Sequence, residues 1–185
     1  MRLFIAIEIP GDIKTAIGGL RVDIPGARWV PVEQIHLTLA FLGEVEEAAV
    51  ERLTEELARI HLSGFELSFE GAGCFPNRHR PRILWIGVVP HPHLIDLASR
   101  VREAVLACNI PQEERPFSPH ITLARLKLSP SQAFDAFLDQ NKKLKLPRFR
   151  VREITLFQSR LTPHGAVHIP VRSFSLAIAG VNGTL

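Results

Sequence analysis

The chain has 185 residues, 46% of them hydrophobic and 22% charged, which is typical of a soluble globular protein with one substantial core. Its net charge of +3 and pI near 9.2 permit a nucleic-acid partner without requiring one. No segment reaches the roughly 18 apolar residues of a membrane span, the apolar start is too short for a signal peptide, and the two cysteines suit a reducing compartment, so we expect a cytoplasmic protein without a membrane anchor.

The first half of the chain alternates strand and helix signals. An apolar run predicts a strand over 2–7, and a helix is expected over about 12–22. The alternating run that contains His36-Leu37-Thr38-Leu39 predicts a second strand. Apolar residues at helical spacing, with acids in the first turn, indicate a helix over about 46–60. A third strand is expected near 65–69.

The second half repeats this order about 80 residues further along. A strand over 82–88 is followed by a helix over about 92–107 and by a second alternating run, His120-Ile121-Thr122-Leu123. A helix is then expected over about 130–141, with Ser129 as its N-cap, before a strand over 149–157.

This repetition predicts a duplicated unit of strand, helix, strand, helix and strand. Since no linker rich in glycine and serine separates the copies, we expect two lobes packed face to face about an approximate twofold axis. The two His-x-Thr strands then face each other across a cleft. We assign residues 1–180 to one bilobal domain and residues 181–185 to a tail.

Each His-x-Thr motif places an imidazole and a hydroxyl side by side, because alternate residues of a strand point to the same face. His36 pairs in this way with Thr38, and His120 with Thr122. The imidazole can transfer a proton while the hydroxyl donates a hydrogen bond to an anionic oxygen. Two such pairs predict acid–base chemistry at a phosphoryl centre. The alternative, a buried and hydrogen-bonded histidine, would suit one such residue better than two in matching contexts.

Arginines gather near two aromatic residues, Phe75 and Phe157. Basic side chains neutralise phosphate and aromatic faces stack on bases, so this pattern fits a nucleotide end entering the cleft. The competing interpretation is a solvated set of arginines beside core phenylalanines. The arginines and the histidine concerned are Arg78, His79, Arg80 and Arg82 near Phe75, and Arg148, Arg150, Arg152 and Arg160 near Phe157.

Together these features resemble the two-histidine (2H) phosphoesterase superfamily, and within it the RNA 2′,3′-cyclic phosphodiesterases, historically called 2′-5′ RNA ligases. The resemblance extends from about residue 2 to residue 179. Besides the two His-x-Thr motifs, the segments that carry it are Trp29-Val30, Phe41-Leu42-Gly43, Pro81 to Trp85, Ser118-Pro119 and Phe157-Gln158-Ser159-Arg160-Leu161.

The resemblance implies an α+β fold with antiparallel sheets that line a central cleft and helices outside. It also implies hydrolysis of a terminal RNA 2′,3′-cyclic phosphate to a 2′-phosphate, with His36 as proton donor and His120 as proton acceptor. Thr38 and Thr122 would bind the non-bridging oxygens. Phe75, Phe157, Ser159 and Arg125 are weaker candidates for substrate binding.

Two positions of this chain depart from the pattern of the family. Family members often carry a basic residue after the first motif, where this chain has Ala40, so a phosphate contact from that position is lost. Arg125 follows the second motif, but strict alternation places it on the face opposite His120 unless the strand bends.

No metal or other cofactor is expected. The pairs His91/His93 and His164/His168 lack Cys, Asp or Glu at ligand spacing, and the chain has no glycine-rich nucleotide loop. We expect a monomer that acts on RNA ends or nucleotides with a 2′,3′-cyclic phosphate. Two alternatives remain open: reversible 2′-5′ ligation of cyclic-phosphate and 5′-hydroxyl ends, and a module that binds nucleotides or RNA without turnover.

Overall fold

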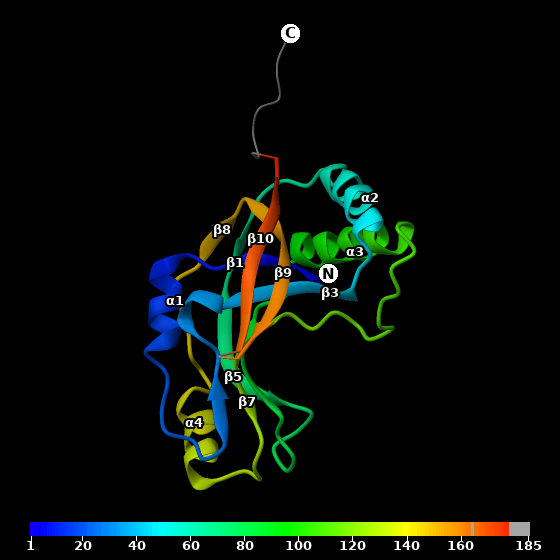
Figure 1. Ribbon diagram of the computed structural model, residues 1–185. Helices are drawn as coiled ribbons and strands as arrows, with labels where there is room; N and C mark the ends of the chain where they lie inside the picture. The colour runs from blue at the N-terminus through cyan, green and yellow to red at the C-terminus, as the bar shows by residue number, and fades with distance from the viewer. Residues whose placement is uncertain (164, 178–185) are drawn as a thin grey trace, which may run out of the picture.

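The computed structural model describes residues 1–163 and 165–177, so the expected tail at 181–185 lies outside the described residues. Ten strands and four α-helices are present in this part of the chain (Figure 1). The strands are β1 (Arg2–Glu8), β2 (Ala27–Trp29), β3 (His36–Glu44), β4 (Phe65–Leu67), β5 (Phe69–Phe75), β6 (Ile83–Val88), β7 (His120–Leu126), β8 (Phe149–Val151), β9 (Glu153–Thr162) and β10 (Gly165–Ser175). The helices are α1 (Gly11–Gly18), α2 (Glu47–Ala58), α3 (Pro92–Ala107) and α4 (Gln132–Gln140), and a 3-10 turn covers Val32–Gln34.

The strands form two four-stranded antiparallel sheets, with the orders β10-β9-β1-β3 and β2-β7-β6-β5. The predicted α+β class with antiparallel sheets is therefore confirmed. The duplicated order is also present, since β1, β3 and β5 recur as β6, β7 and β9 with helices at matching places.

The two halves of the chain, however, are not the two lobes. Strand β5 belongs to the first half but pairs with β6, while β9 belongs to the second half but pairs with β1. The short strands β4 and β8 pair with each other where the two halves cross. Each four-stranded sheet therefore contains two strands from each half, so neither half forms a complete sheet by itself.

The strand expected near 65–69 covers β4 and only the first residue of β5, and the strand expected over 149–157 covers β8 and the first half of β9. Two further strands, β2 and β10, were not predicted at all. Strand β2 adds to the outer edge of one sheet beside β7, and β10 adds to the other beside β9. β10 is long and pairs with β9 from Gly165 to Ser175, which makes the β9–β10 hairpin the longest antiparallel pair in the described chain. Both strands break the twofold repeat.

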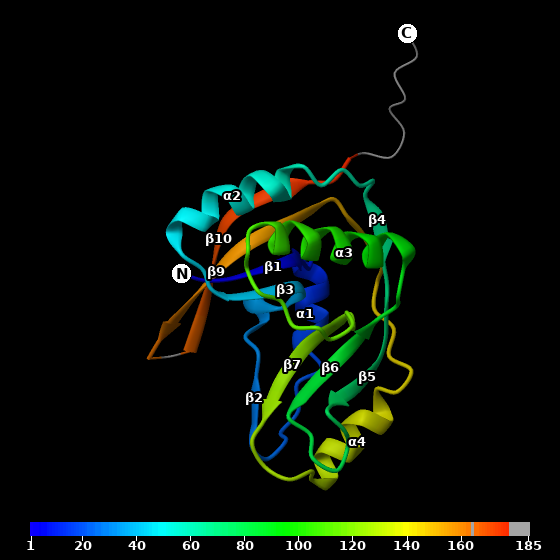
Figure 2. The ribbon, with the colours of Figure 1, turned by 90° about the vertical axis from the view of Figure 1, so that its right-hand side faces the viewer.

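The helices cover the sheets from outside. Helices α2 and α3 contact each other, and α3 packs on β3 although the two come from different halves. Figures 1 and 2 show this helix pair at one end of the molecule and α4 at the other. Helix α4 packs on the second sheet, where the rings of Phe137 and Trp29 meet edge to face with 5.7 Å between centroids. No helix in the described residues is both long and apolar enough to span a bilayer.

Helix α4 also begins later than predicted. The expected N-cap was Ser129, but Ser131 is the cap, and its Oγ accepts a hydrogen bond from the Phe134 backbone N–H at 3.2 Å. Either serine suits a cap by type, and only Ser131 stands three residues before a backbone N–H that the helix leaves without a partner.

One side of each four-stranded sheet carries the predicted motifs, and we call it the histidine face. On β3, His36 and Thr38 are half-buried on this face, while Leu37 and Leu39 are buried in the main core. Residues His120 and Thr122 of β7 are placed in the same way. Strands β3 and β7 contact each other although they belong to different sheets.

Both strands also bend at the same place after the motif. Two consecutive residues, Leu39 and Ala40 on β3, point into the core, and the pairing with β1 shifts register there. On β7, Leu123 and Ala124 do the same, with a register shift against β6. Such a bulge shifts the alternation by one residue, so the residues that follow it lie on the opposite face from the one that strict alternation predicts.

Candidate active site

The two motif histidines are held by the same kind of hydrogen bond. His36 Nδ1 lies 2.7 Å from the carbonyl oxygen of Gln34, and His120 Nδ1 lies 2.7 Å from that of Ser118. A carbonyl oxygen only accepts, so Nδ1 donates in both cases and must carry a proton. Each neutral ring therefore keeps the lone pair on Nε2, which remains available for proton transfer.

Thr38 completes the first motif as predicted. Its Oγ1 lies 3.0 Å from His36 Nε2, and since that nitrogen has the lone pair in the neutral ring, the hydroxyl donates. Thr122 occupies the corresponding place on β7, opposite Trp85 of β6, and is half-buried. The sequence prediction that each His and Thr share one face is confirmed by this placement.

An aromatic layer supports His36. Phe4, Ala6 and Phe157 form a small buried cluster, separate from the main core. The Phe4 ring lies 4.9 Å from the His36 ring and stacks on Phe157 at 5.2 Å, both between centroids. Because Phe157 is only 7% exposed, it supports Phe4 from below and has little surface to offer a nucleotide base.

A third histidine, His168 of β10, stands beside this layer. Its ring lies 4.8 Å from Phe4 and 5.2 Å from His36 between centroids. On the neighbouring strand β9, Ser159 is directly opposite His168, so the candidate Ser159 lies on the same face. The sequence suggested His168 only as a candidate metal ligand, because the strand that carries it was not predicted.

The surroundings of His120 are aromatic as well but differ in detail. The Phe75 ring meets His120 edge to face at 4.9 Å, and the Trp85 ring lies at 6.4 Å, both between centroids. Opposite Trp85 stands Gly73, where an added Cβ would come within 2.3 Å of the indole ring. Glycine at position 73 therefore leaves room for the indole ring, which a side chain there would displace.

Burial controls the protonation of His36. Desolvation lowers its pKa from 6.5 to about 4, and the nearby His168 and Lys14 act in the same direction. The hydrogen bond to Gln34 and the charge of Glu8 oppose this shift without reversing it. Burial also lowers the pKa of His168. In the absence of an anion, His36 is therefore neutral at neutral pH.

The bulges decide which side chains after the motifs reach the histidine face. Arg125 pairs with Ile83, which alternates with Trp85, so it lies on the same face as His120. The bend that the sequence left open is thus present. On β3 the corresponding residue is Phe41, which is 68% exposed and lies 6.3 Å from Phe4 between ring centroids. Ala40 points into the core instead, and a longer side chain there would not reach this face.

Sequence reasoning missed Phe41 because strict alternation from His36 assigns position 41 to the core. The available signal was the repeat itself. Phe41 and Arg125 each stand five residues after a motif histidine, and both motifs continue with the same pattern of buried and exposed positions.

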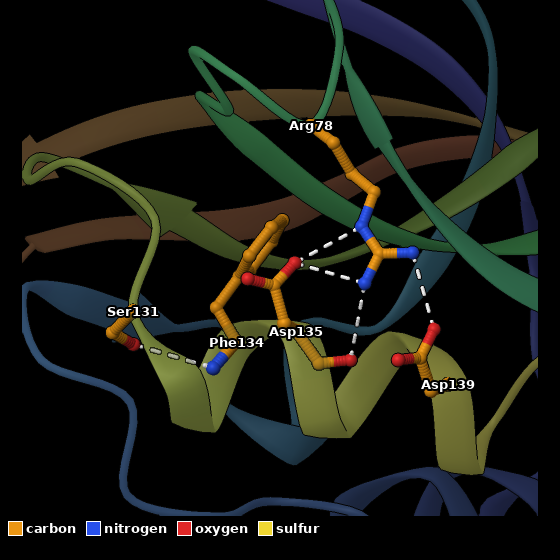
Figure 3. A network of polar contacts seen from close by, with 5 residues as sticks. All are labelled: Arg78, Ser131, Phe134, Asp135 and Asp139. Atoms are coloured by element: carbon orange, nitrogen blue, oxygen red, sulfur yellow. Dashed lines mark hydrogen bonds and ion pairs between the residues drawn. The ribbon is translucent and has the colours of Figure 1, made fainter.

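Several arginines near the aromatic residues have structural roles. Figure 3 shows Arg78 bound to two carboxylates of α4, with Nε 3.0 Å from Asp135 Oδ1 and Nη1 3.1 Å from Asp139 Oδ1. Arg148 lies 3.5 Å from a carboxylate oxygen of Glu66, and Arg150 donates to the Gly64 carbonyl oxygen at 2.9 Å. Of the two interpretations left open for these arginines, the contacts favour a structural one for all three, because Arg78 joins its loop to α4, Arg148 pairs with Glu66, and Arg150 binds the backbone at Gly64.

The histidine pairs considered as metal ligands also have other surroundings. His91 is the N-cap of α3, where its Nδ1 accepts from the His93 backbone N–H at 3.2 Å, and its ring stacks on Phe65. His164 lies outside the described residues. Among the residues that are described, no three or more His, Cys, Asp or Glu side chains are grouped so as to hold a metal ion.

Comparison with known proteins identifies the family. The family model described as "2'-5' RNA ligase superfamily" matches residues 9–162. The RNA 2',3'-cyclic phosphodiesterase of Archaeoglobus fulgidus is 33% identical over 177 residues, which cover 94% of this chain and 99% of that protein. The protein of the same name from Thermus thermophilus is 35% identical, and the match covers 95% of this chain and 90% of that one.

Solved structures agree with these sequence matches. The crystal structure of E. coli LigT complexed with 3'-AMP superposes with a TM-score of 0.78 at 31% identity, covering 95% of this chain and 97% of LigT. TT0787 of Thermus thermophilus gives a TM-score of 0.78 at 30% identity, covering 97% of this chain and all of that one. The resemblance found in the sequence is thus confirmed, and the chain belongs to the 2′-5′ RNA ligase superfamily.

Proposed function

We propose that this protein hydrolyses the 2′,3′-cyclic phosphate at the end of an RNA strand and leaves a 2′-phosphate. The observation that carries this proposal is the matched pair His36 and His120, each with Nδ1 hydrogen-bonded to a carbonyl oxygen and with Nε2 left to exchange a proton. In His36 this nitrogen accepts a hydrogen bond from the Thr38 hydroxyl. The names of the relatives support the same reaction. Both motifs come from one chain, so a monomer suffices.

The two histidines divide the proton transfers. His120 Nε2 takes a proton from the attacking water, and His36 Nε2 gives a proton to the departing 3′ oxygen. The bond between phosphorus and the 3′ oxygen breaks as the bond to the water oxygen forms, which leaves the phosphate on the 2′ oxygen. This division follows the family resemblance. Because both rings are held by the same kind of hydrogen bond, the alternative is the opposite assignment, with His36 as the base and His120 as the acid.

The low pKa of His36 defines when it can act as the donor. A ring with a pKa of about 4 carries a proton in few molecules at neutral pH. A phosphate anion bound against Nε2 favours the charged imidazolium and raises the pKa. Substrate binding therefore charges the donor, and His36 of the free protein stays neutral.

Three side chains stabilise the charge that develops on the phosphate. Thr122 donates a hydrogen bond to a non-bridging oxygen from its place on the histidine face beside His120. Thr38 does the same once His36 is protonated, because the charged ring no longer accepts and the Thr38 hydroxyl hydrogen turns from Nε2 to the phosphate. Arg125 lies on the same face and supplies a positive charge with the forked geometry that phosphate accepts.

The nucleotide base is bound by exposed aromatic rings. Phe41 is the strongest candidate because 68% of its surface is exposed on the histidine face. Phe75 is half-buried against His120 and takes a smaller part. Ser159 stands at the rim beside His168, where its hydroxyl can reach ribose or phosphate oxygens.

Hydrolysis of adenosine 2′,3′-cyclic phosphate and of an RNA ending in this group, with EDTA present, tests the proposal. Chromatography separates 2′- from 3′-phosphate products. We expect the 2′-phosphate at a rate that EDTA does not change, because two imidazoles provide the acid and the base. Release of the 3′-phosphate, or activity that EDTA abolishes and a divalent cation restores, contradicts the mechanism.

Ligation is the second candidate, because the matching family is described as a 2'-5' RNA ligase superfamily. The same two histidines can catalyse the same ring opening with a 5′-hydroxyl in place of water as the nucleophile, so that the bond from phosphorus to the 3′ oxygen breaks and a 2′-5′ phosphodiester forms. Addition of excess 5′-hydroxyl RNA distinguishes the two: a 2′-5′-linked product indicates ligation, whereas unchanged release of the 2′-phosphate indicates hydrolysis alone. Absence of any turnover would favour the binding module.

A further inference from the structure

Two arginines face each other at the edge of the second sheet. Arg28 of β2 is directly opposite Arg125 of β7 in the antiparallel pairing, so both side chains lie on the histidine face. Both are exposed. Within the described residues, neither has a hydrogen bond or an acidic partner, in contrast to Arg78 with its two aspartates. Like charges directly opposite on a sheet destabilise it, so this pair calls for an anionic ligand.

The guanidinium of Arg28 lies where the two sheets meet. Its Nη2 is 2.8 Å from the position that a Cβ at Gly165 would occupy, in the turn of the β9–β10 hairpin. The same hairpin is tied to the segment before the first motif, where Gln34 Nε2 donates to the Ala166 carbonyl oxygen at 2.6 Å. In Figure 1 the tip of the hairpin lies beside the end of β2. Arg28 thus stands at the border of the site, further from the core than Arg125.

We propose that Arg28 binds the phosphodiester that precedes the terminal nucleotide, which makes RNA strands better substrates than cyclic mononucleotides. This inference rests on the proposed function. A terminal cyclic phosphate brings one negative charge, and Arg125 meets it. An RNA strand carries a further negative charge at each preceding phosphodiester. Arg28 is the unpaired cation next to Arg125 that can bind the first of these phosphodiesters. A guanidinium binds a phosphodiester through two parallel hydrogen bonds.

The substrate pair that isolates this contact is adenosine 2′,3′-cyclic phosphate and the dinucleotide ApA with a 2′,3′-cyclic phosphate, which adds one phosphodiester. We expect Arg28→Ala to lower kcat/KM about tenfold for the dinucleotide and less than about twofold for the mononucleotide. For RNA strands, the slope of log kcat/KM against log salt should fall by about 1. Arg28→Lys should recover part of the loss, since it keeps the charge but not the fork.

Arg160→Ala is the matched control. Arg160 belongs to the arginines that the sequence groups with Phe157, but on β9 it pairs with Val167, one position along from Ser159. Its exposed side chain therefore lies on the face opposite Ser159 and Phe157, away from the proposed site. It removes the same charge and should leave both substrates unaffected. Thermal unfolding of Arg28→Ala should occur at the wild-type temperature or above, because a repulsion is removed.

The outcomes separate this inference from the function on which it rests. Turnover of both substrates by the wild-type protein establishes the reaction. The inference is then overturned if Arg28→Ala slows both substrates equally or slows neither. Failure of the wild-type protein to hydrolyse either substrate overturns the proposed function itself.

Discussion

The imidazole rings of His36 and His168 lie 5.2 Å apart between centroids and cross at 78°. They come from β3 and β10, at opposite edges of one sheet, and they meet over the Phe4 ring. Burial is the main reason why the pKa of His36 falls to about 4, and the neighbouring imidazole adds to it because two charged rings would repel.

The protonation of His36 should therefore depend on bound phosphate. We expect NMR titration of the His36 Cε1 proton to give a midpoint near 4 in the free protein, and a higher midpoint when adenosine 2′-monophosphate is bound. The variant His36→Gln assigns the resonance. An equal midpoint with and without the nucleotide contradicts the proposal that the substrate charges the donor.

The same shift predicts a loss of stability in acid. The unfolded chain takes up a proton on His36 near pH 6.5, whereas the folded protein takes it up only near pH 4. Stability contributed by the neutral ring is present above pH 6.5 and lost as the pH falls toward 4, by about 3 kcal/mol in all. Urea unfolding at pH 7 and pH 4 should show a decrease in the wild-type protein that exceeds the decrease in His36→Gln by about this amount. Equal decreases would show that His36 is not buried in a neutral state.

The threonines should matter for turnover and little for folding. Replacing Thr38 or Thr122 by Val keeps the branched shape on the strand but removes a donor to the phosphate. We expect kcat to fall by about 10²-fold, as for loss of one donor in other oxyanion sites. Thr→Ser at the same positions should recover most of the rate. Wild-type rates in both Val variants would show that the hydroxyls do not contact the transition state.

Phe41 and Phe157 should give opposite results when replaced by Ala. Phe41 is 68% exposed, so we expect little change in stability but weaker nucleotide binding, by about 1 to 3 kcal/mol per stacked base. Phe157 is 7% exposed and stacked on Phe4, so its loss should destabilise the protein by about 3 to 5 kcal/mol. Urea unfolding and titration with adenosine 2′-monophosphate separate the two effects, and similar behaviour of the two variants would refute these assignments.

Periodicity predicted the order of strands and helices, since apolar spacing is a local property of the chain. It also placed His36 and Thr38 on one face, and His120 and Thr122 on one face. It could not show that β5 and β9 exchange sheets, because pairing partners depend on contacts between distant segments. Strand β10 was missed for a similar reason: Val167, His168 and Pro170 give no clear alternation.

Local irregularity explains the misplaced site residues. A one-residue bulge moved Arg125 onto the histidine face and brought Phe41 to the surface, and a bulge leaves no reliable mark in a single sequence. The structural role of Arg78 could not be predicted, because its partners Asp135 and Asp139 lie on a helix more than fifty residues away in the sequence. The residue types of the two motifs were enough to predict their chemistry, but only the folded structure shows which other residues surround them.

Comparison of His36→Ala, His120→Ala and the double variant, on RNA with a 2′,3′-cyclic phosphate end and with EDTA present, tests the central claim most directly. We expect each single variant to lower kcat by about 10²-fold or more with the fold retained, and the double variant to be little slower than the worse single one, because both rings act in one transition state. The exposed His61→Ala serves as control and should keep the wild-type rate. A near wild-type rate in either motif variant would contradict the paired acid–base mechanism.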